Sequence, residues 1–553
     1  MNAEVIPYHW DDRNKLYSDY QYLKIIYENM LKALQVQLNE IHQVDYSLRY
    51  WRILIGPWLG YFIQMVFDRW TMLKYAFKKY DINKCSILEK DENALIPNDM
   101  DTFSDLYYND EWNEMIYSEL VQEYLQNNLF IEIVKKTNDK LQPTLKRNQI
   151  FNFIFSKLQR TVIYNFFSYN KWINNSNKYF FINTYLPLSL EKKLLSRLGQ
   201  EKQNWELKSI PIADIDIKMR DWKIRDGHTL NDDFISVLNR MIPRHIPLAY
   251  LEGYNGLLGL IKNLNWPRNP KCIFTSVLHV ANDTFKAWTA EKVENGTSLI
   301  IGQHGGHFGM TPWSFLEEHQ IEVSDTWLSW GWSNKTKPQI LPIGNLKVMD
   351  NKVDYDPNGI AMMVAMTFPR YSYHMYAVPV ASQWLSYFED QCRFISALSS
   401  SLRNQILIKP FPHDWGWCQK ERWSEKFHQI RFASSDQSII NLVNKSRLYI
   451  STYNATTYLE SLAWNVPTIM FWNPDHWELR KDSIPYFELL KSAGIFHETP
   501  ESAAKQMVDI WDDIPSWWGS EIVQNNRIKF CERYSYIPES PLEELTNIFL
   551  NVK

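Results

Sequence analysis

The chain has 553 residues, enough for about two to four domains of ordinary size. Hydrophobic residues make up 45% and charged residues 22%, and these values exclude a fibrous or an intrinsically disordered protein. The 59 Lys and Arg are nearly balanced by 63 Asp and Glu, so we expect no nucleic acid among the partners.

The cysteines and the N-terminus indicate the compartment. Five cysteines are scattered along the chain without a C-x-x-C pair, so we expect neither a disulfide framework nor a zinc site. The first residues carry charges and no apolar core of a secretion signal. Both features predict a cytoplasmic protein.

The first part of the chain predicts helices. Apolar side chains recur at helical spacing through residues 16–80, where Pro57 is expected to interrupt the pattern. The most apolar stretch, residues 51–67, is short for a transmembrane helix and contains Arg52. We expect a buried helix pair there, with peripheral contact at the inner membrane as the alternative.

Residues 100–170 are also mostly helical in pattern, whereas short apolar runs bounded by turn residues follow from about residue 178. Such runs, alternating with helical segments, are typical of parallel sheets covered on both faces. The runs lie at residues 178–186, 272–277, 298–306, 327–332, 359–366, 405–412, 448–453 and 467–472.

The polar stretch 340–359 divides these strands into two groups. We therefore predict an α/β fold of two facing Rossmann-type domains, residues 176–345 and 346–553, after a mostly helical elaboration over residues 1–175. Ligands of such sheets bind beyond the carboxyl ends of the strands, so the functional residues are expected in the loops that follow them.

The first candidate loop, residues 302–309, joins an apolar strand to a glycine-rich turn with two histidines. Glycines let a ligand approach the backbone, whose N–H groups can hold an anion. His304 and His307 could act as acid, base or phosphate ligand, although a tight turn with hydrogen-bonded histidines is the alternative. We assign His304 to catalysis and the rest to donor binding: Gln303, Gly305, Gly306 and His307.

The next candidate segment, residues 313–332, is rich in carboxylates. A carboxylate here could be a general base or a nucleophile, and we select Glu318 and Asp325. An exposed acidic helix is the alternative. A metal site is not expected because the spacing does not match H-E-x-x-H.

Two loops of the second half complete the predicted site. Lys409 and His413 follow a strand, where prolines fix the loop, and could bind a phosphate or a carboxylate; a solvated rim is the alternative. A strand, a hydroxyl-rich turn and a helix start at residues 448–463 suit a phosphate, and Glu460 could accept hydrogen bonds from a ribose. Simple N-capping is the alternative there. The polar residues of this turn are Ser451, Thr452, Asn454, Thr456 and Thr457.

The segment 457–469 resembles the nucleotide-binding half of GT-B glycosyltransferases, where a Glu-containing helix precedes a short loop, a Pro and a strand. Nearly the whole chain resembles a transferase family of bacterial surface-carbohydrate biosynthesis clusters. The strings that carry this resemblance lie at residues 13–23, 48–59, 302–309, 318–332, 409–417 and 451–472.

This resemblance implies a GT-B-like fold and transfer of a Kdo or nonulosonic (sialic-acid-like) sugar from a CMP-activated donor. The acceptor would be a glycan or a lipid-linked glycan of a surface polysaccharide such as lipopolysaccharide or capsule, and no cofactor or metal is expected. The resemblance places Glu460 at the ribose and Lys409 and His413 near the base or the sugar carboxylate. It places four residues at the donor phosphate: Ser451, Thr452, Asn454 and Thr456.

Two other functions stay open. A GT-B transferase could use a UDP-sugar, a GDP-sugar or a CDP-polyol as donor. The chain could also be a non-catalytic scaffold of polysaccharide assembly. Aromatic residues make up 15% of the chain and either fill its core or line a sugar path. We expect Trp51 and Trp58 in the core. We expect some of the tryptophans in the candidate loops to line a sugar path: Trp313, Trp327, Trp330, Trp332, Trp415, Trp417, Trp464 and Trp472.

Overall fold

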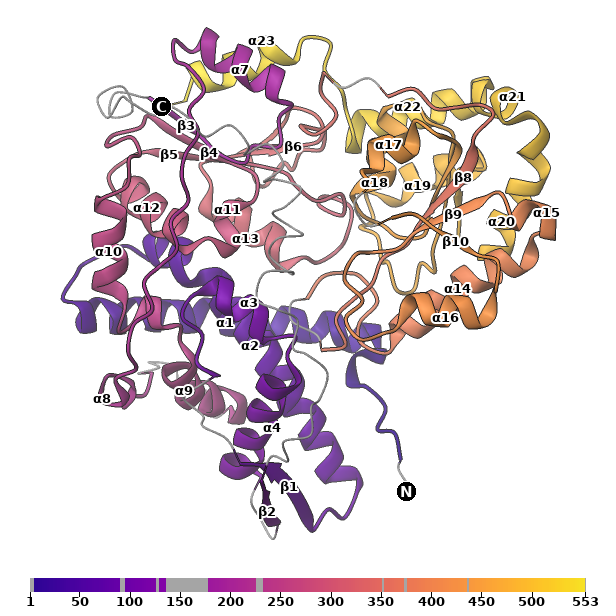
Figure 1. Cartoon of the computed structure of the whole chain (residues 1–553). Helices are drawn as coiled ribbons and strands as arrows, with labels where there is room; N and C mark the ends of the chain where they lie inside the picture. The colour runs from indigo at the N-terminus through magenta and orange to yellow at the C-terminus, as the bar shows by residue number, and fades with distance from the viewer. Residues whose placement is uncertain are drawn as a thin grey trace.

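The computed structural model describes residues 4–89, 95–125, 129–135, 178–224, 232–350, 353–371, 375–434 and 437–552. Two long helices, α1 (Arg13–His42) and α2 (Leu48–Lys79), pack against each other beneath two α/β domains (Figure 1). Side chains cap both helices: Asp12 accepts hydrogen bonds from two backbone N–H groups at the start of α1, and Ser47 accepts one at the start of α2.

Helix α2 is buried along most of its length, as expected for residues 51–67, but it is one helix and not a pair. Pro57 lies inside the helix and does not end it, because packing on all sides offsets the hydrogen bond that proline cannot make. Trp51 and Trp58 are fully buried, so contact of this stretch with a membrane is wrong for this fold. In the part of the chain that the structure describes, no helix is both long and apolar enough to cross a membrane.

The helical region touches both α/β domains. Phe315 and His319 of the first domain pack against Gly60 and Gly56 of α2, where an added Cβ would lie within 3 Å of their rings. On the other side, Arg13 of α1 forms an ion pair with Glu478 of the second domain, with 2.7 Å between Nε and Oε1. The long helices therefore brace the two domains against each other.

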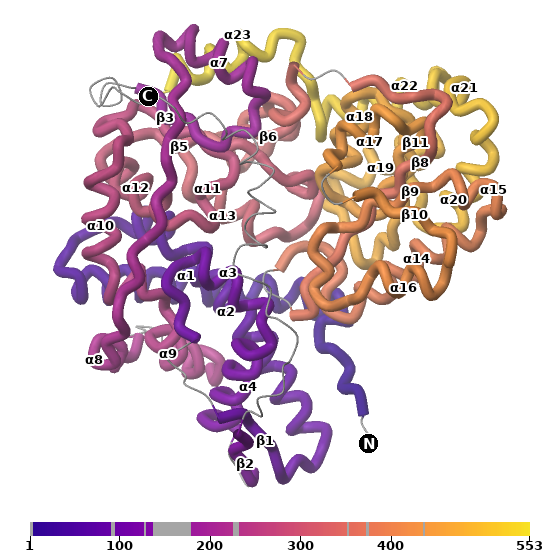
Figure 2. Tube along the Cα trace, in the orientation of Figure 1, coloured from indigo at the N-terminus to yellow at the C-terminus, as the bar shows by residue number. Residues whose placement is uncertain are grey.

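The remainder of the N-terminal region is mixed. Helices α3 (Met100–Leu106) and α4 (Asp110–Tyr124) were predicted, but strands β1 (Lys84–Leu88) and β2 (Phe130–Val134) were not. These two strands pair in parallel and project from the body of the molecule (Figures 1 and 2). Residues 136–177 of the predicted helical segment lie outside the described residues.

The first α/β domain has a five-stranded parallel sheet in the order β3-β4-β5-β6-β7. Its strands are β3 (Tyr179–Phe181), β4 (Cys272–Thr275), β5 (Ser298–Gly302), β6 (Thr326–Ser329) and β7 (Ile340–Pro342). Its helices are α7 (Leu188–Arg197), α8 (Ile217–Arg220), α9 (Asp233–His245), α10 (Tyr254–Lys262), α11 (Leu278–Ala281), α12 (Asp283–Glu294) and α13 (Phe315–Val323).

The second α/β domain has a six-stranded parallel sheet in the order β10-β9-β8-β11-β12-β13. Its strands are β8 (Ile360–Val364), β9 (Ile406–Lys409), β10 (Arg431–Phe432), β11 (Ser446–Ser451), β12 (Thr468–Phe471) and β13 (Phe496–His497). Its helices are α14 (Gln383–Ala397), α15 (Ser400–Arg403), α16 (Gln419–Lys426), α17 (Ile439–Val443), α18 (Thr456–Ala463), α19 (Ile484–Ser492), α20 (Pro500–Ile510), α21 (Ile514–Gly519) and α22 (Glu521–Tyr534). Short 3₁₀ turns lie at His9–Asp11, Leu248–Tyr250 and Trp511–Asp513.

Two parallel sheets and a helical N-terminal region confirm the predicted fold class. The predicted domain boundary near residue 345 falls between the two sheets, but the chain crosses back at its end. Helix α23 (Pro541–Leu550) packs on α7 of the first domain, where Leu545 and Phe549 are buried (Figures 1 and 2). The last helix therefore belongs to the core of the first domain.

Candidate active site

The structure brings together the two loops with the richest chemistry. The Gly306 N–H donates to Thr456 Oγ1 at 3.2 Å, so the glycine-rich turn after β5 meets the start of α18 in the other domain. The approach is so close that a Cβ on Gly306 would lie 2.3 Å from the carbonyl oxygen of Ala455. The candidate site therefore lies where the carboxyl edge of the first sheet faces the amino end of α18.

The amino end of α18 has the properties of an anion-binding site. Ala455 occupies the N-cap, and no side-chain hydrogen bond caps the helix. The Asn454 side chain is 1% exposed; its Oδ1 accepts from the Tyr458 hydroxyl at 2.9 Å, while its Nδ2 has no partner. Helix N–H groups, the helix dipole and a buried amide donor all favour a negatively charged ligand here.

Other polar side chains of this turn hold the loop itself. Ser451 Oγ donates to the Tyr453 carbonyl, and Thr452 Oγ1 donates to the Val364 carbonyl at 2.8 Å. Thr457 Oγ1 lies 3.0 Å from the Tyr453 hydroxyl. The predicted phosphate contacts of Ser451 and Thr452 are therefore wrong in this geometry, because both hydroxyls donate to backbone carbonyls and both side chains are buried.

Glu460 faces a lysine that was not among the predicted site residues. Lys347 Nζ lies 2.5 Å from Glu460 Oε1 and 5.4 Å from the centre of the Tyr185 ring. Tyr185 follows β3, and Lys347 follows β7, so both come from the carboxyl edge of the first sheet. Burial disfavours the charge on Lys347, but Glu460 and Tyr185 outweigh it and hold the pKa of Lys347 above its ordinary value.

The two histidines of the glycine-rich turn are half-buried and uncharged near neutral pH. Burial is the main cause that lowers the pKa of His304 to about 4, and the positive charge of Lys347 also lowers it. Hydrogen bonding to the Ser276 backbone and to Gln320 opposes this shift. Burial, followed by His304 and Arg480, lowers the pKa of His307 to about 3. Nε2 of His307 lies 3.2 Å from Ser314 Oγ. Both imidazoles can therefore accept a hydrogen bond at pH 7.

Gln303 is a structural residue, which corrects its assignment to donor binding. Its side chain is fully buried, its Nε2 donates to the Gly305 carbonyl, and its Oε1 accepts from Trp330 N and Trp332 Nε1. These bonds fix the turn from beneath. Five of the tryptophans considered for a sugar path are buried, namely Trp313, Trp327, Trp330, Trp332 and Trp472. Trp415, Trp417 and Trp464 are half-buried, so a role along a sugar path stays a prediction for these three.

The predicted catalytic carboxylates point away from the site. Glu318 forms an ion pair with Lys24 of α1, and Asp325 lies at the amino end of β6, where it is 40% exposed and pairs with Arg49. The carboxylate that faces the glycine-rich turn is Glu317, which accepts from the Gly309 N–H at 2.8 Å. One helical position separates Glu317 from Glu318 and directs their side chains to different faces of α13.

We therefore expect Glu318→Gln and Asp325→Asn to keep turnover within about twofold of the wild type, because exposed ion pairs contribute little. Steady-state rates of the two variants beside Glu317→Gln test this expectation. Glu317→Gln removes the charge that faces the glycine-rich turn, so it should reduce the rate. A large loss in Glu318→Gln with an unaffected Glu317→Gln would restore the original assignment.

Lys409 and His413 lie on the second domain beyond β9. Lys409 is buried, and its Nζ donates to the Ser434 carbonyl at 2.6 Å. The backbone carbonyl of His413 accepts from the Thr367 hydroxyl, and its ring lies 5.2 Å from the ring of Trp415. A role for these two side chains at the donor stays a prediction. Among the described residues, no cluster of His, Cys, Asp or Glu could hold a metal ion.

Acid is expected to destabilise the fold through three histidines whose pKa lies below its ordinary value. Burial, followed by Arg52 and Lys286, lowers the pKa of His319 from 6.5 to about 3, and His304 and His307 are also shifted down. Between about pH 6.5 and 4 the unfolded chain binds protons on these imidazoles that the folded chain does not bind. Stability therefore falls as the pH falls through this window.

Thermal unfolding at about pH 7.5, 6 and 5 measures this effect. The midpoint should fall at each step, and it should fall less in His319→Gln than in the wild type. Equal slopes in the two proteins would contradict the lowered pKa of His319.

Two further cations of the site, Lys347 and Arg480, were not predicted from the sequence. Arg480 of the second domain pairs with Glu317 at 2.5 Å and donates to the Thr311 carbonyl at 2.6 Å. Lys347 belongs to the polar stretch 340–359, which was interpreted as a connection. The signal that could have located Lys347 is the short run Ile340–Pro342, a strand whose carboxyl end precedes it.

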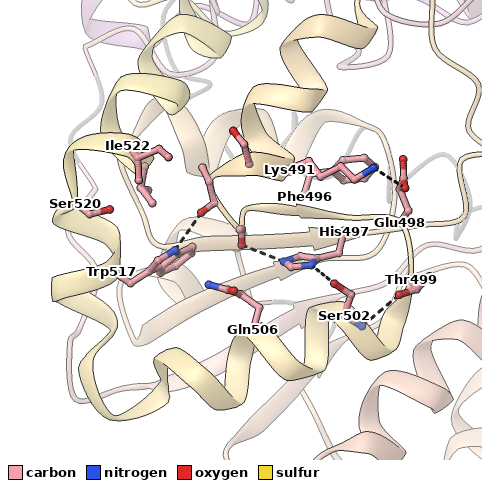
Figure 3. A pocket seen from close by; sticks show the side chains of 14 residues that line it. Lys491, Phe496, His497, Glu498, Thr499, Ser502, Gln506, Trp517, Ser520 and Ile522 are labelled. Atoms are coloured by element: carbon pink, nitrogen blue, oxygen red, sulfur yellow. Dashed lines mark hydrogen bonds and ion pairs between the residues drawn. The ribbon is translucent and has the colours of Figure 1, made fainter.

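A separate pocket of about 580 Å³ lies at the outer edge of the second domain, beside β13 (Figure 3). Its buried imidazole, His497, has both ring nitrogens engaged: Nδ1 with Ser502 Oγ at 2.8 Å and Nε2 with the Gly494 carbonyl at 3.1 Å. Trp517 Nε1 donates to the Ala493 carbonyl on the opposite wall. None of the predicted site residues lines this pocket, so it is distinct from the interdomain site.

The fold and the site define a two-domain α/β protein with its candidate ligand site between the domains. A sequence model described as LIC12162 family transferase matches residues 1–549, so the chain belongs to this transferase family. The resemblance to a transferase family is thereby confirmed, and the protein is an enzyme of the transferase class. No curated protein sequence matches the chain.

Several solved structures are distantly similar to this chain. An α,α-trehalose-phosphate synthase (UDP-forming) from Burkholderia vietnamiensis is 8% identical over 54% of this chain and 75% of its own, with a TM-score of 0.30. The spinosyn rhamnosyltransferase SpnG is 12% identical over 54% and 77%, with a TM-score of 0.30. WaaG, a glycosyltransferase involved in lipopolysaccharide biosynthesis, is 10% identical over 68% and 99%, with a TM-score of 0.29. At these scores the likeness assigns no activity.

Proposed function

We propose that this transferase moves a Kdo or nonulosonic sugar from a CMP-activated donor to a glycan or lipid-linked glycan of a bacterial surface polysaccharide. The observation that carries the proposal is the uncapped amino end of α18, with its unpartnered Asn454 amide, held against the glycine-rich turn of the other domain. The second domain supplies a phosphate-binding helix start, and the first domain supplies His304 and His307 as acid–base groups. This arrangement suits group transfer from a nucleotide. Family membership supports transfer as the reaction class.

The leaving nucleotide monophosphate gains negative charge as the glycosidic bond breaks. The helix dipole and N–H groups of α18 stabilise this charge, and Glu460 accepts hydrogen bonds from the ribose. His304 accepts the hydrogen bond of the acceptor hydroxyl. A bound anionic donor offsets the charge of Lys347, so it raises the pKa of His304 and makes this imidazole a stronger base only when the donor is present.

Nucleotide release from a panel of donors tests the proposal. CMP-Kdo, a CMP-nonulosonate, a UDP-sugar and a CDP-polyol are each incubated with the wild type, Glu460→Gln and Glu318→Gln. We expect CMP release from a CMP-ulosonate, about tenfold slower in Glu460→Gln and unchanged in Glu318→Gln. We expect the same rate with a metal chelator present.

Two outcomes would contradict the proposal. Release only from the UDP-sugar or the CDP-polyol would assign a different donor. No release, together with no binding of CMP or CDP in calorimetry, would favour a scaffold of polysaccharide assembly. We also propose peripheral contact with the inner membrane through a surface other than residues 51–67, and sedimentation with anionic vesicles tests it.

A further inference from the structure

Lys347 connects the two domains at the centre of the candidate site. It stands on the segment that leaves β7 of the first domain, and its Nζ lies 2.5 Å from Glu460 on α18 of the second. His304 lies close enough for the lysine charge to lower its pKa. One ammonium group therefore pairs with the proposed ribose ligand and acts electrostatically on the proposed catalytic imidazole.

Its position is fixed by the chain segment that leads back to the first domain. Asn345 Nδ2 donates to Ser535 Oγ at 3.0 Å, and Ser535 Oγ donates to the Leu459 carbonyl at 2.9 Å. Leu459 precedes Glu460, so the same hydrogen bonds hold both partners of the ion pair. Gly344, with φ +110°, passes so close that a Cβ would lie 2.7 Å from the Tyr536 carbonyl oxygen.

The surroundings favour an anion as a further ligand of Lys347. Glu460 is 8% exposed and Lys347 32% exposed, so the pair lies at the wall of the site and not on an open surface. A buried ion pair contributes little net stability, because desolvation opposes its attraction. A lysine ammonium has three donors and can bridge a carboxylate and a phosphate oxygen. The amino end of α18, one helical turn before Glu460, adds positive potential to the same corner.

We infer that Lys347 binds the phosphate of the donor nucleotide while Glu460 binds the adjacent ribose. This inference rests on the proposed function, because it needs a nucleotide donor. It adds Lys347, on the segment that leaves β7, to the donor-binding groups on α18 of the second domain. Donor binding therefore also fastens the two domains together.

Calorimetry with CMP and with cytidine separates the phosphate from the nucleoside. The proteins are the wild type, Lys347→Met, Glu460→Gln and the double variant, which removes both charges and leaves no unpaired carboxylate. Lys337→Met is the matched control, because Lys337 is 30% exposed and ion-paired with Glu322 outside the site. Thermal unfolding confirms that each variant is folded before it is titrated.

We expect Lys347→Met to weaken CMP binding about 10- to 100-fold and to change cytidine binding by less than about threefold. The double variant should also lose the preference for CMP over cytidine. Glu460→Gln should weaken both ligands, and Lys337→Met neither.

Unchanged CMP affinity in Lys347→Met, or an equal loss for CMP and cytidine, would overturn this inference about Lys347 but would not contradict the proposed donor function. If the wild type binds neither ligand, the proposed donor function is wrong and the inference falls with it.

Discussion

Replacing Gly306 by alanine is expected to reduce kcat/KM about 100-fold. The new Cβ would lie 2.3 Å from the Ala455 carbonyl oxygen and 2.4 Å from its carbonyl carbon, and these backbone atoms cannot rotate away. The two loops must separate, and a displacement of about 1 Å between reacting groups costs on the order of 100-fold in rate. Initial rates with the donor that releases its nucleotide measure the effect.

Gly305→Ala is the matched control, since the neighbours of its Cβ lie at 3.5 Å and belong to side chains. Neither glycine has a positive φ, so alanine strains neither backbone and only the contact differs. We expect Gly305→Ala to keep most of the activity. Equal activity in the two variants would show that the approach of the loops is not required for the reaction.

Replacing Arg480 by methionine is expected to lower the free energy of unfolding by about 3 kcal/mol, because it leaves a buried carboxylate without its partner. The Glu317 side chain is 4% exposed and Arg480 is 25% exposed, so most of the pair is out of water. Thermal unfolding should show a midpoint that is lower by several degrees. Activity should fall too, because Glu317 also holds the glycine-rich turn through Gly309.

The double variant Arg480→Met/Glu317→Gln should recover part of the lost stability, since it removes the unpaired charge. Lys505→Met removes an exposed ion pair with Asp509 and should leave the midpoint unchanged. If the unfolding midpoint of Arg480→Met were as unchanged as that of Lys505→Met, the ion pair between Arg480 and Glu317 would contribute nothing to the stability of the interface between the domains.

Much of the fold could be predicted because the strands are short, apolar and bounded by turn residues. The run at residues 272–277 became β4 and the run at 298–306 became β5, each one or more residues shorter at its carboxyl end. Strand β7 was missed because two of its three residues are exposed and it lies in a polar stretch. Pro57 was expected to interrupt the helical pattern but lies inside α2, because local propensity is weak beside complete burial.

The site was predicted at the level of loops and less well at the level of side chains. The glycine-rich turn and the start of α18 were both selected, and they are in contact. Glu318 was preferred to Glu317 because a sequence does not show which helical face turns toward a ligand and which toward α1. Gln303 was selected for its place in the loop, although its amide oxygen accepts hydrogen bonds from Trp330 and Trp332.

The sequence by itself determined the class of fold, the two loops that carry the chemistry and the family, because hydrophobic periodicity, glycine spacing and long specific strings are local properties. The tertiary structure decided which side chains converge. Lys347 and Glu460 are far apart in the chain, as are Arg480 and Glu317, and each pair forms where the two α/β domains meet. Long-range pairing depends on how two domains pack, and no local pattern encodes that packing.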